Sequence, residues 1–208
     1  MNARSRPRAP TAPLLQFELF GDPIKGPPGF RYGRDFIDTS EEAALIARLE
    51  ALPFEPFDFH GHLANRRVAG FGLRYDYERR VVTEAPPLPD WLMDLRRKVG
   101  AFADRAADAF VQVLINEYRQ GAGIGWHKDR PQFDEVVGVS LMAPCTLRFR
   151  RKTGDGWERI SSNLEVRSAY LLTGPSRSEW EHSISPLDQR RYSITFRTLS
   201  GLVGLGAS

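Results

Sequence analysis

The sequence predicts a mainly β fold with flanking helices, in which two sheets form a β-sandwich or jelly roll and helices pack on one side. Three observations carry this prediction. Short β-branched and aromatic segments follow one another from residue 111 onward, with turn residues between them. Two segments before residue 111 carry helix signals, a capping box in the first and apolar residues at helical spacing in the second. The chain has 208 residues, 41% of them hydrophobic, which suits one domain with a real core.

The first half of the chain contains the two predicted helices. Residues 1–13 are basic and proline-rich, and we interpret them as a flexible arm; a targeting or nucleic-acid-contacting role is the weaker alternative. Residues 14–20 can form a first strand, and residues 26–36 form a Gly/Pro-rich loop that leads to an extended piece. Thr39 and Glu42 have capping-box spacing, so a helix should begin there and stop at Pro53. Asp90 is expected to cap a second helix, whose apolar residues are Trp91, Leu92, Leu95, Val99 and Phe102.

The second half should consist of strands. We expect them at residues 111–118, 136–142, 146–151, 157–160, 167–173, 179–184 and 192–198. Residues 153–156, with the sequence Thr-Gly-Asp-Gly, should form a hairpin turn between two of these strands.

Composition limits the classes of protein to consider. The net charge of +3 and pI near 9.2 favour an ordinary soluble surface over a nucleic-acid partner when charge is taken alone. The single cysteine, Cys145, excludes an internal disulfide, and we interpret it as a small buried residue. No stretch approaches the roughly 18 apolar residues of a membrane span, and none resembles a signal peptide. We therefore expect a cytoplasmic monomer with no membrane partner.

The most informative motif is His127-x-Asp129, followed much later by His182. Residues two apart on a strand face the same side, so His127 and Asp129 can share one metal, and His182 could approach across the barrel. Two imidazoles and one carboxylate leave other metal positions open, as in non-haem Fe(II) oxygenases. The motif occurs by chance in many chains, and the alternative for His127 is a surface histidine. The pair His60 and His62 has no acid at metal spacing, so we interpret both as loop histidines.

A cationic strand follows the last of these histidines. Alternation places Arg191, Ser193, Thr195 and Arg197 on one face and the apolar Tyr192, Ile194 and Phe196 on the other. If the polar face is buried, an anion must pair with its arginines, and a dicarboxylate co-substrate would do so at both ends. The alternative is an outward-facing polar edge. Asn116 and Tyr118 similarly share a face and could hydrogen-bond the same ligand.

Taken together and in order, these pieces resemble the AlkB family of Fe(II)- and 2-oxoglutarate-dependent dioxygenases. The matching residues are Asn116-x-Tyr118, Gly121, His127-x-Asp129, Val139-Ser140-Leu141, His182 and Arg191-Tyr192-x-x-Thr195-Phe196-Arg197. The resemblance covers residues 111–199 well and residues 14–110 only in layout. It implies a double-stranded β-helix (jelly-roll) core with an N-terminal extension, within a single domain at residues 14–208.

The resemblance also implies roles for these residues. His127, Asp129 and His182 would hold Fe(II), and Arg191, helped by Tyr118, would pair with the distal carboxylate of 2-oxoglutarate. Asn116 and Arg197 would contact the end nearer the metal, while Ser193 and Thr195 complete the polar face. With O2, the family oxidises 2-oxoglutarate to succinate and CO2 and hydroxylates a C–H bond.

Two positions depart from the family pattern. Ser193 stands where many repair members have asparagine, so we expect altered affinity rather than loss. Pro131 stands where the bacterial repair enzyme has an acid near the substrate base, so base preference does not carry over.

The expected substrate is nucleic acid carrying N1-methyladenine or N3-methylcytosine, as single-stranded or duplex DNA or as RNA. A flipped base needs aromatic faces, and phosphates need cations. Residues 66–80, at the place of the family's nucleotide-recognition lid, supply both through Arg66, Arg67, Phe71, Arg74, Tyr75, Tyr77, Arg79 and Arg80. The alternative is a packed strand face with solvated arginines. Arg177 and Trp180 are further substrate candidates, although Trp180 could equally belong to the core.

Three other functions remain open from the sequence. The same oxygenase chemistry could act on a protein or lipid, or on tRNA as a modifying reaction. A catalytically silent β-sandwich that only binds a partner is the third, and the intact metal triad argues against it.

Overall fold

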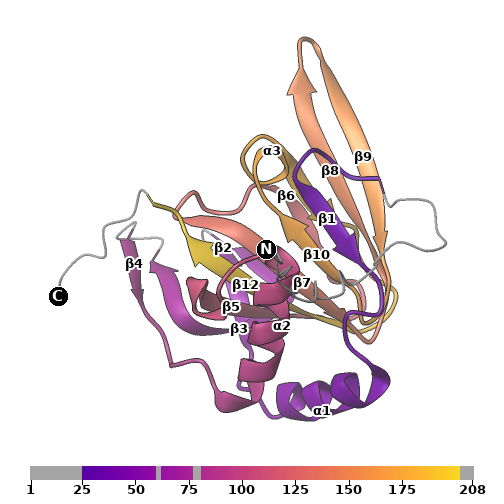
Figure 1. The fold of residues 1–208 in the computed structure, drawn as a ribbon. Helices are drawn as coiled ribbons and strands as arrows, with labels where there is room; N and C mark the ends of the chain where they lie inside the picture. Colours follow the sequence, from indigo (N-terminus) through magenta and orange to yellow (C-terminus); the bar gives the residue numbers. More distant parts are fainter. Residues whose placement is uncertain (1–24, 60–61, 77–80, 202–208) are drawn as a thin grey trace, which may run out of the picture.

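Two antiparallel sheets form the body of the protein in this computed structural model, which describes residues 25–59, 62–76 and 81–201 (Figure 1). The larger sheet has the strand order β1-β10-β7-β12-β5-β3-β2, with β4 paired to β3; the smaller has the order β6-β11-β8-β9. The strands are β1 (Phe30–Gly33), β2 (Glu55–Phe59), β3 (His62–Asp76), β4 (Val81–Glu84), β5 (Phe110–Tyr118), β6 (Ile124–His127), β7 (Phe133–Leu141), β8 (Cys145–Thr153), β9 (Gly156–Leu164), β10 (Ala169–Leu172), β11 (Glu181–Ile184) and β12 (Arg191–Leu199).

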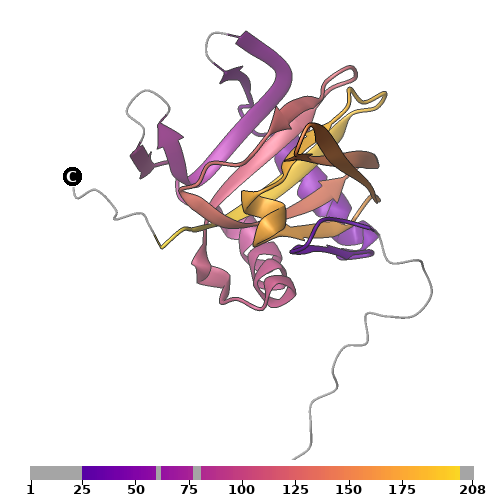
Figure 2. The same cartoon turned by 90° about the horizontal axis from the view of Figure 1, so that it is seen from above.

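The connections between the sheets follow the jelly-roll pattern. From β5 onward the chain passes from the larger sheet to the smaller and back: β6 lies in the smaller sheet, β7 in the larger, β8 and β9 in the smaller, β10 in the larger, β11 in the smaller and β12 in the larger. This arrangement confirms the predicted mainly β class with a jelly-roll core. The long strand β3, which lies next to the edge strand β2 on the side of the larger sheet remote from β1, is strongly curved (Figure 2).

The helices α1 (Thr39–Glu50) and α2 (Met93–Ala103) pack against the larger sheet, and a short helix α3 (Pro175–Ser178) precedes β11. Leu49 and Val99, both 0% exposed, join a core cluster with Ile115 and Ile194 of the central strands. A second cluster, which includes Leu147 and the predicted buried residue Cys145, fills the smaller sheet's inner side. The two clusters lie on opposite faces of the larger sheet.

Most predicted strands are confirmed within a few residues, and so is the hairpin turn between β8 and β9, where Gly154 adopts a positive φ of 52°. The last-but-one strand begins at Glu181 rather than residue 179, because residues 175–178 turn into α3. His62 lies in β3, paired with Phe59, so its assignment to a loop was wrong. The predicted arm at residues 1–13, the strand at 14–20 and His60 lie outside the described residues.

Both helix starts differ from the prediction. The N-cap of α1 is Asp38, not Thr39: its Oδ1 accepts from the Glu41 backbone N–H at 2.8 Å, and the Glu41 carboxylate accepts from the Asp38 N–H at 3.0 Å. Glu42 is instead buried and accepts from the Arg167 guanidinium at 3.0 Å. Asp90 opens a 3-10 turn (Asp90–Leu92) ahead of α2, and its carboxylate makes no cap. No helix of the described part is long and apolar enough to cross a membrane.

Truncating Leu49 to alanine should destabilise the protein by about 2–5 kcal/mol, because its side chain is 0% exposed and the packed sheet can close the cavity only partly. Chemical denaturation with the linear extrapolation checks this value. Arg48→Ala, on the exposed side of the same helix, is the matched control and should leave stability nearly unchanged. Equal stability of the two variants would contradict the packing of α1 described above.

Candidate metal and co-substrate site

The three predicted metal ligands come together at the inner side of the smaller sheet. His127 ends β6 and lies directly opposite His182 in the neighbouring strand β11, so His182 approaches from the adjacent strand and not from across the barrel. The two rings are 4.3 Å apart between centroids, and the His182 Nε2 lies 3.7 Å from the Asp129 Oδ2. One donor atom from each of the three residues lies within 4.8 Å of the others, close enough to share one ion.

The ligands are held in the protonation states that a metal requires. The His127 Nδ1 lies 2.9 Å from the Gly125 carbonyl oxygen, to which it donates in the tautomer that leaves Nε2 free for a metal. Burial lowers the pKa of His127, and burial together with the neighbouring His127 lowers the pKa of His182 to about 3. Burial alone would raise the pKa of Asp129, but the Arg197 guanidinium and the two imidazoles outweigh it and hold that pKa well below its usual range.

The polar face of β12 forms the wall beside this triad. β12 lies in the middle of the larger sheet between β5 and β7, so the alternative of an outward polar edge is wrong. Its inward residues are buried, with exposed fractions of 0% for Arg191, 3% for Ser193, 5% for Thr195 and 8% for Arg197. The other face packs into the first core cluster through Tyr192, Ile194 and Phe196, as predicted.

Arg191 of this wall has only part of its guanidinium hydrogen-bonded. Its Nη2 donates to the Ser140 Oγ at 2.6 Å, and its guanidinium lies 5.3 Å from the Tyr118 ring centroid. Its Nε and Nη1 are buried and have no hydrogen-bond partner among the described residues. An unpaired buried cation is costly, and a carboxylate fits the guanidinium fork, so this position suits one end of a dicarboxylate.

Arg197 connects the same wall to the metal ligands. Its Nη2 donates to the Asp129 Oδ1 at 3.2 Å, while its Nη1 donates to the Thr195 Oγ1 at 3.2 Å. The Thr195 hydroxyl in turn donates to the Leu114 carbonyl at 2.7 Å. A ligand lying along β12 from Arg191 would therefore reach the metal position beside Arg197.

Strand β5 supplies the remaining predicted co-substrate residues. In the register of β5 and β12, Asn116 lies opposite Ser193 and Tyr118 lies opposite Arg191. The Asn116 Oδ1 accepts a hydrogen bond from the Arg66 Nη1 at 2.8 Å. The structure thus places all six predicted co-substrate residues on adjoining strands around one buried polar space.

Two residues of this space were not assigned a role from the sequence. Ser140 of β7 accepts from Arg191, as described above. Tyr170 of β10 is 7% exposed, and burial and then the neighbouring Tyr118 raise its pKa above the usual range. The only sequence signal for Tyr170 was the alternation of strand residues between two faces. In the structure Ala169 and Leu171 belong to one core cluster, and Tyr170 and Leu172 belong to the other.

The predicted substrate residues are not all on one surface. Residues 66–72 of the predicted lid pair with β5, so this part of it is built into the larger sheet. Arg66 points into the polar space, whereas Arg67 lies on the other face and forms an ion pair with Glu117 at 2.5 Å. Phe71 is half-buried against the first core cluster, and Arg74 is exposed. Tyr77, Arg79 and Arg80 lie outside the described residues.

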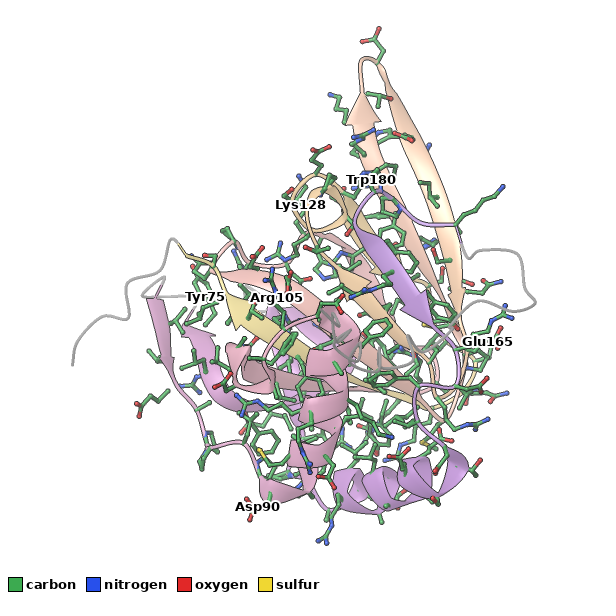
Figure 3. The ribbon with its side chains drawn as sticks, viewed as in Figure 1. Tyr75, Asp90, Arg105, Lys128, Glu165 and Trp180 are labelled. Carbon is green, nitrogen blue, oxygen red and sulfur yellow. The ribbon has the colours of Figure 1, made fainter. Side chains whose placement is uncertain are left out.

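Tyr75 is a predicted substrate residue of β3 that contacts the loop carrying Asp129. The Arg130 Cζ lies 5.2 Å from the Tyr75 ring centroid, and Arg130 directly follows Asp129. Figure 3 shows Tyr75 on the outer part of β3, away from α3. An aromatic ring and a guanidinium therefore meet beside the triad, as recognition of a base would require.

Arg177 and Trp180, both predicted as substrate residues, are buried. Arg177 is 7% exposed and donates to the backbone carbonyls of Asp129 (3.1 Å), Phe133 (2.5 Å) and Arg130. Its guanidinium therefore braces the loop that carries Asp129 and does not reach outward to a substrate. Trp180 is 0% exposed in the second core cluster, beside α3 (Figure 3). Its assignment to a substrate surface was wrong, and the core alternative is confirmed.

Replacing Arg177 by methionine should weaken binding of a divalent metal about 10- to 100-fold, because residues that orient metal ligands have effects of this size. Isothermal titration with Mn(II) measures the change. Arg97→Met, on the exposed side of α2, is the control and should bind like the original protein. Unchanged Mn(II) affinity in a folded Arg177→Met variant would show that the three carbonyl contacts do not position Asp129.

Comparison with known proteins decides the family. The family model of the 2OG-Fe(II) oxygenase superfamily matches residues 30–197. The chain belongs to this superfamily. The match confirms the predicted oxygenase class and the expected Fe(II), 2-oxoglutarate and O2, for which the triad and the unpaired Arg191 are suitable partners.

Several curated relatives of this oxygenase are AlkB homologues, which confirms the predicted AlkB family. The mouse tRNA (carboxymethyluridine(34)-5-O)-methyltransferase ALKBH8 is 29% identical over 168 residues, covering 77% of this chain and 24% of the mouse protein. The zebrafish probable RNA/DNA demethylase ALKBH6 is 32% identical over 126 residues, covering 59% of this chain and 50% of its own. The chain thus spans about a quarter of the mouse ALKBH8 protein and half of the zebrafish ALKBH6 protein. The solved structure of OsALKBH1 has the same fold, with a TM-score of 0.63, 19% identity, and coverage of 85% of this chain and 100% of that one.

Proposed function

We propose that this AlkB-family oxygenase removes N-methyl groups from the bases of nucleic acid. One observation carries the proposal: a His-Asp-His triad lies beside the buried Arg191, whose Nε and Nη1 have no hydrogen-bond partner among the described residues. Together these residues can hold a metal and a dicarboxylate side by side and leave one face for a substrate. When bound, Fe(II) with 2-oxoglutarate and O2 supplies the oxidising power for hydroxylation of a C–H bond.

The chain's own residues divide the remaining work. His127, Asp129 and His182 hold the metal. Arg177 fixes the loop between β6 and β7, which carries Asp129. Arg191 and Tyr118 bind the far carboxylate of the co-substrate, while Arg197 orients its nearer end and keeps Asp129 ionised. The second core cluster lies on the same face of the larger sheet, and together with the burial of these residues it keeps water out of this space.

N-methylated bases suit this chemistry. Hydroxylation of the methyl carbon inserts one oxygen atom of O2 into a C–H bond and gives a hemiaminal. The C–N bond of the hemiaminal then breaks, the nitrogen takes up the hydroxyl proton, and formaldehyde leaves. Supporting observations are the Tyr75–Arg130 contact beside the triad and the word demethylase in the name of the ALKBH6 relative. The tRNA-modifying alternative draws on the name of the mouse ALKBH8 relative, of which this chain spans only about a quarter.

The test is a substrate panel followed by intact mass. Purified chain with Fe(II), ascorbate and 2-oxoglutarate is incubated with single-stranded DNA, duplex DNA, RNA and tRNA carrying N1-methyladenine or N3-methylcytosine. We expect loss of one methyl mass from at least one of these and no loss with His127→Ala. Succinate formation without any methyl loss would move the substrate to a protein, a lipid or another tRNA position.

A further inference from the structure

The outer face of the smaller sheet carries a basic and aromatic surface that the proposed site does not use. Along β8, Leu147 and Phe149 point inward into the second core cluster, so Arg148, Arg150 and Lys152 point outward. Cross-strand register adds Trp157 opposite Lys152 and Arg159 opposite Arg150. We call this surface the hairpin face and define it by Trp126, Arg148, Arg150, Lys152, Trp157 and Arg159.

The hairpin face is an ordered set of alternating rings and cations. The Arg150 Cζ lies 4.5 Å from the Trp126 ring centroid and 4.3 Å from the Trp157 centroid, so one guanidinium lies between two indoles. The Arg148 Cζ lies 5.1 Å from the Trp126 centroid, and the Arg150 Nε donates to the Glu181 Oε2 at 2.5 Å. These contacts hold the rings in place before any ligand arrives, which lowers the entropic cost of binding.

The charge and the exposed indole point to one kind of ligand. The face carries four cations against the single carboxylate of Glu181, so it attracts a polyanion. Trp157 has 40% of its surface exposed and, with Met142, is one of the two large hydrophobic side chains exposed in the described part of the chain. Cations interleaved with exposed aromatic rings bind single-stranded nucleic acid, because bases stack on the rings while phosphates pair with the cations.

The place of this face relates it to the metal site. Trp126 directly precedes His127, and β6 is the edge strand of the smaller sheet. The face continues from there onto the β8–β9 hairpin, which projects from the body of the molecule (Figure 1). A strand whose reacting base lies at His127 needs to cross only the β6 edge to reach Trp126 and then Trp157.

We infer that the hairpin face binds a single-stranded stretch of nucleic acid that flanks the reacting base. That a base reacts at the metal site rests on the proposed function, but binding of the flanking strand does not require catalysis. Unmodified oligonucleotides therefore suffice as the probe, and metal and co-substrate can be left out.

Fluorescence anisotropy with labelled 12-nucleotide single strands and the matching duplex tests the inference. We expect Trp157→Ala to weaken single-strand binding about tenfold, as removal of one stacking ring does, and Trp157→Phe to restore most of it. In the double variant Lys152→Glu, Arg159→Glu, the logarithm of the binding constant should fall less steeply with the logarithm of salt concentration, by the slope that about two phosphate contacts contribute. Met142→Ala and Arg48→Glu, exposed on other parts of the molecule, are the matched controls and should bind normally.

The outcomes separate this inference from the proposed function. Hairpin variants that bind single strands as well as the original protein would overturn the inference, and so would equal weakening toward single strand and duplex. In either case a demethylation result with the original protein would stand. Selective loss of single-strand binding, combined with no demethylation of any substrate, would support the hairpin face and reject the proposed function.

Discussion

Replacing Arg191 by methionine should raise the dissociation constant for 2-oxoglutarate by about 100-fold or more and abolish turnover at ordinary co-substrate concentrations. Arg191 is 0% exposed, and two of the three nitrogens of its guanidinium have no hydrogen-bond partner in the described part of the chain. These two nitrogens can donate to a carboxylate of the co-substrate. Removing one partner of a buried hydrogen-bonded ion pair has effects of this size. Methionine has a similar length and fills the space without a charge.

The same variant should be more heat-stable than the original protein when no co-substrate is present. An uncompensated buried cation destabilises a folded protein, and methionine removes it. Differential scanning fluorimetry with Mn(II) should therefore show a higher Tm for Arg191→Met, and 2-oxoglutarate should raise the Tm of the original protein only. Arg190→Met, whose side chain points to Glu117 on the opposite face, is the control and should respond to 2-oxoglutarate normally. A full Tm response in Arg191→Met would place the co-substrate elsewhere.

Replacing His182 by alanine should reduce metal affinity by more than about 100-fold, beyond the effect expected for residues that only orient a ligand. His182 is 8% exposed, lies directly opposite His127 and supplies one of the three donor atoms of the triad. The removed group is neutral, because burial lowers its pKa to about 3, and its loss leaves no unpaired charge. The fold should therefore survive the change.

Mn(II) binding followed by electron paramagnetic resonance measures this loss directly, without any substrate. Ser183→Ala changes the next residue of β11, whose hydroxyl accepts from Arg148 at 3.1 Å on the other face, and should bind Mn(II) normally. If a folded His182→Ala variant bound Mn(II) as tightly as the control, the metal would have to be held by other residues.

Alternation and motif order were enough to predict the central strands and the wall of the site. The polar face of β12 was predicted from residues 191–197 because a strand has a strict period of two, and the register with β5 confirms it. The cap of α1 was misplaced by one residue because Asp38 and Thr39 are both good caps, and spacing alone does not choose between them. Asp38 is the N-cap because it forms reciprocal hydrogen bonds with Glu41, and these are seen only in the folded backbone.

Contacts between distant segments were the part that the sequence could not supply. Arg177 lies close to His182 in the chain, yet its guanidinium donates to backbone carbonyls of the loop after β6. Every residue has a backbone carbonyl, so the sequence does not indicate which ones an arginine will contact. Trp180 was ambiguous because a tryptophan near a metal ligand fits a substrate surface and a core equally well. The sandwich of Arg150 between Trp126 and Trp157 depends on cross-strand register, which single-sequence patterns leave undetermined.

The measurement that tests the central claim most directly counts two products of one reaction. Succinate and demethylated oligonucleotide are quantified together from an N1-methyladenine or N3-methylcytosine substrate, with His127→Ala as the inactive control. We predict one succinate for each methyl group lost once uncoupled turnover is subtracted, and neither product from the variant. Methyl loss that does not depend on 2-oxoglutarate, or succinate that never accompanies methyl loss on any nucleic acid tested, would contradict the account.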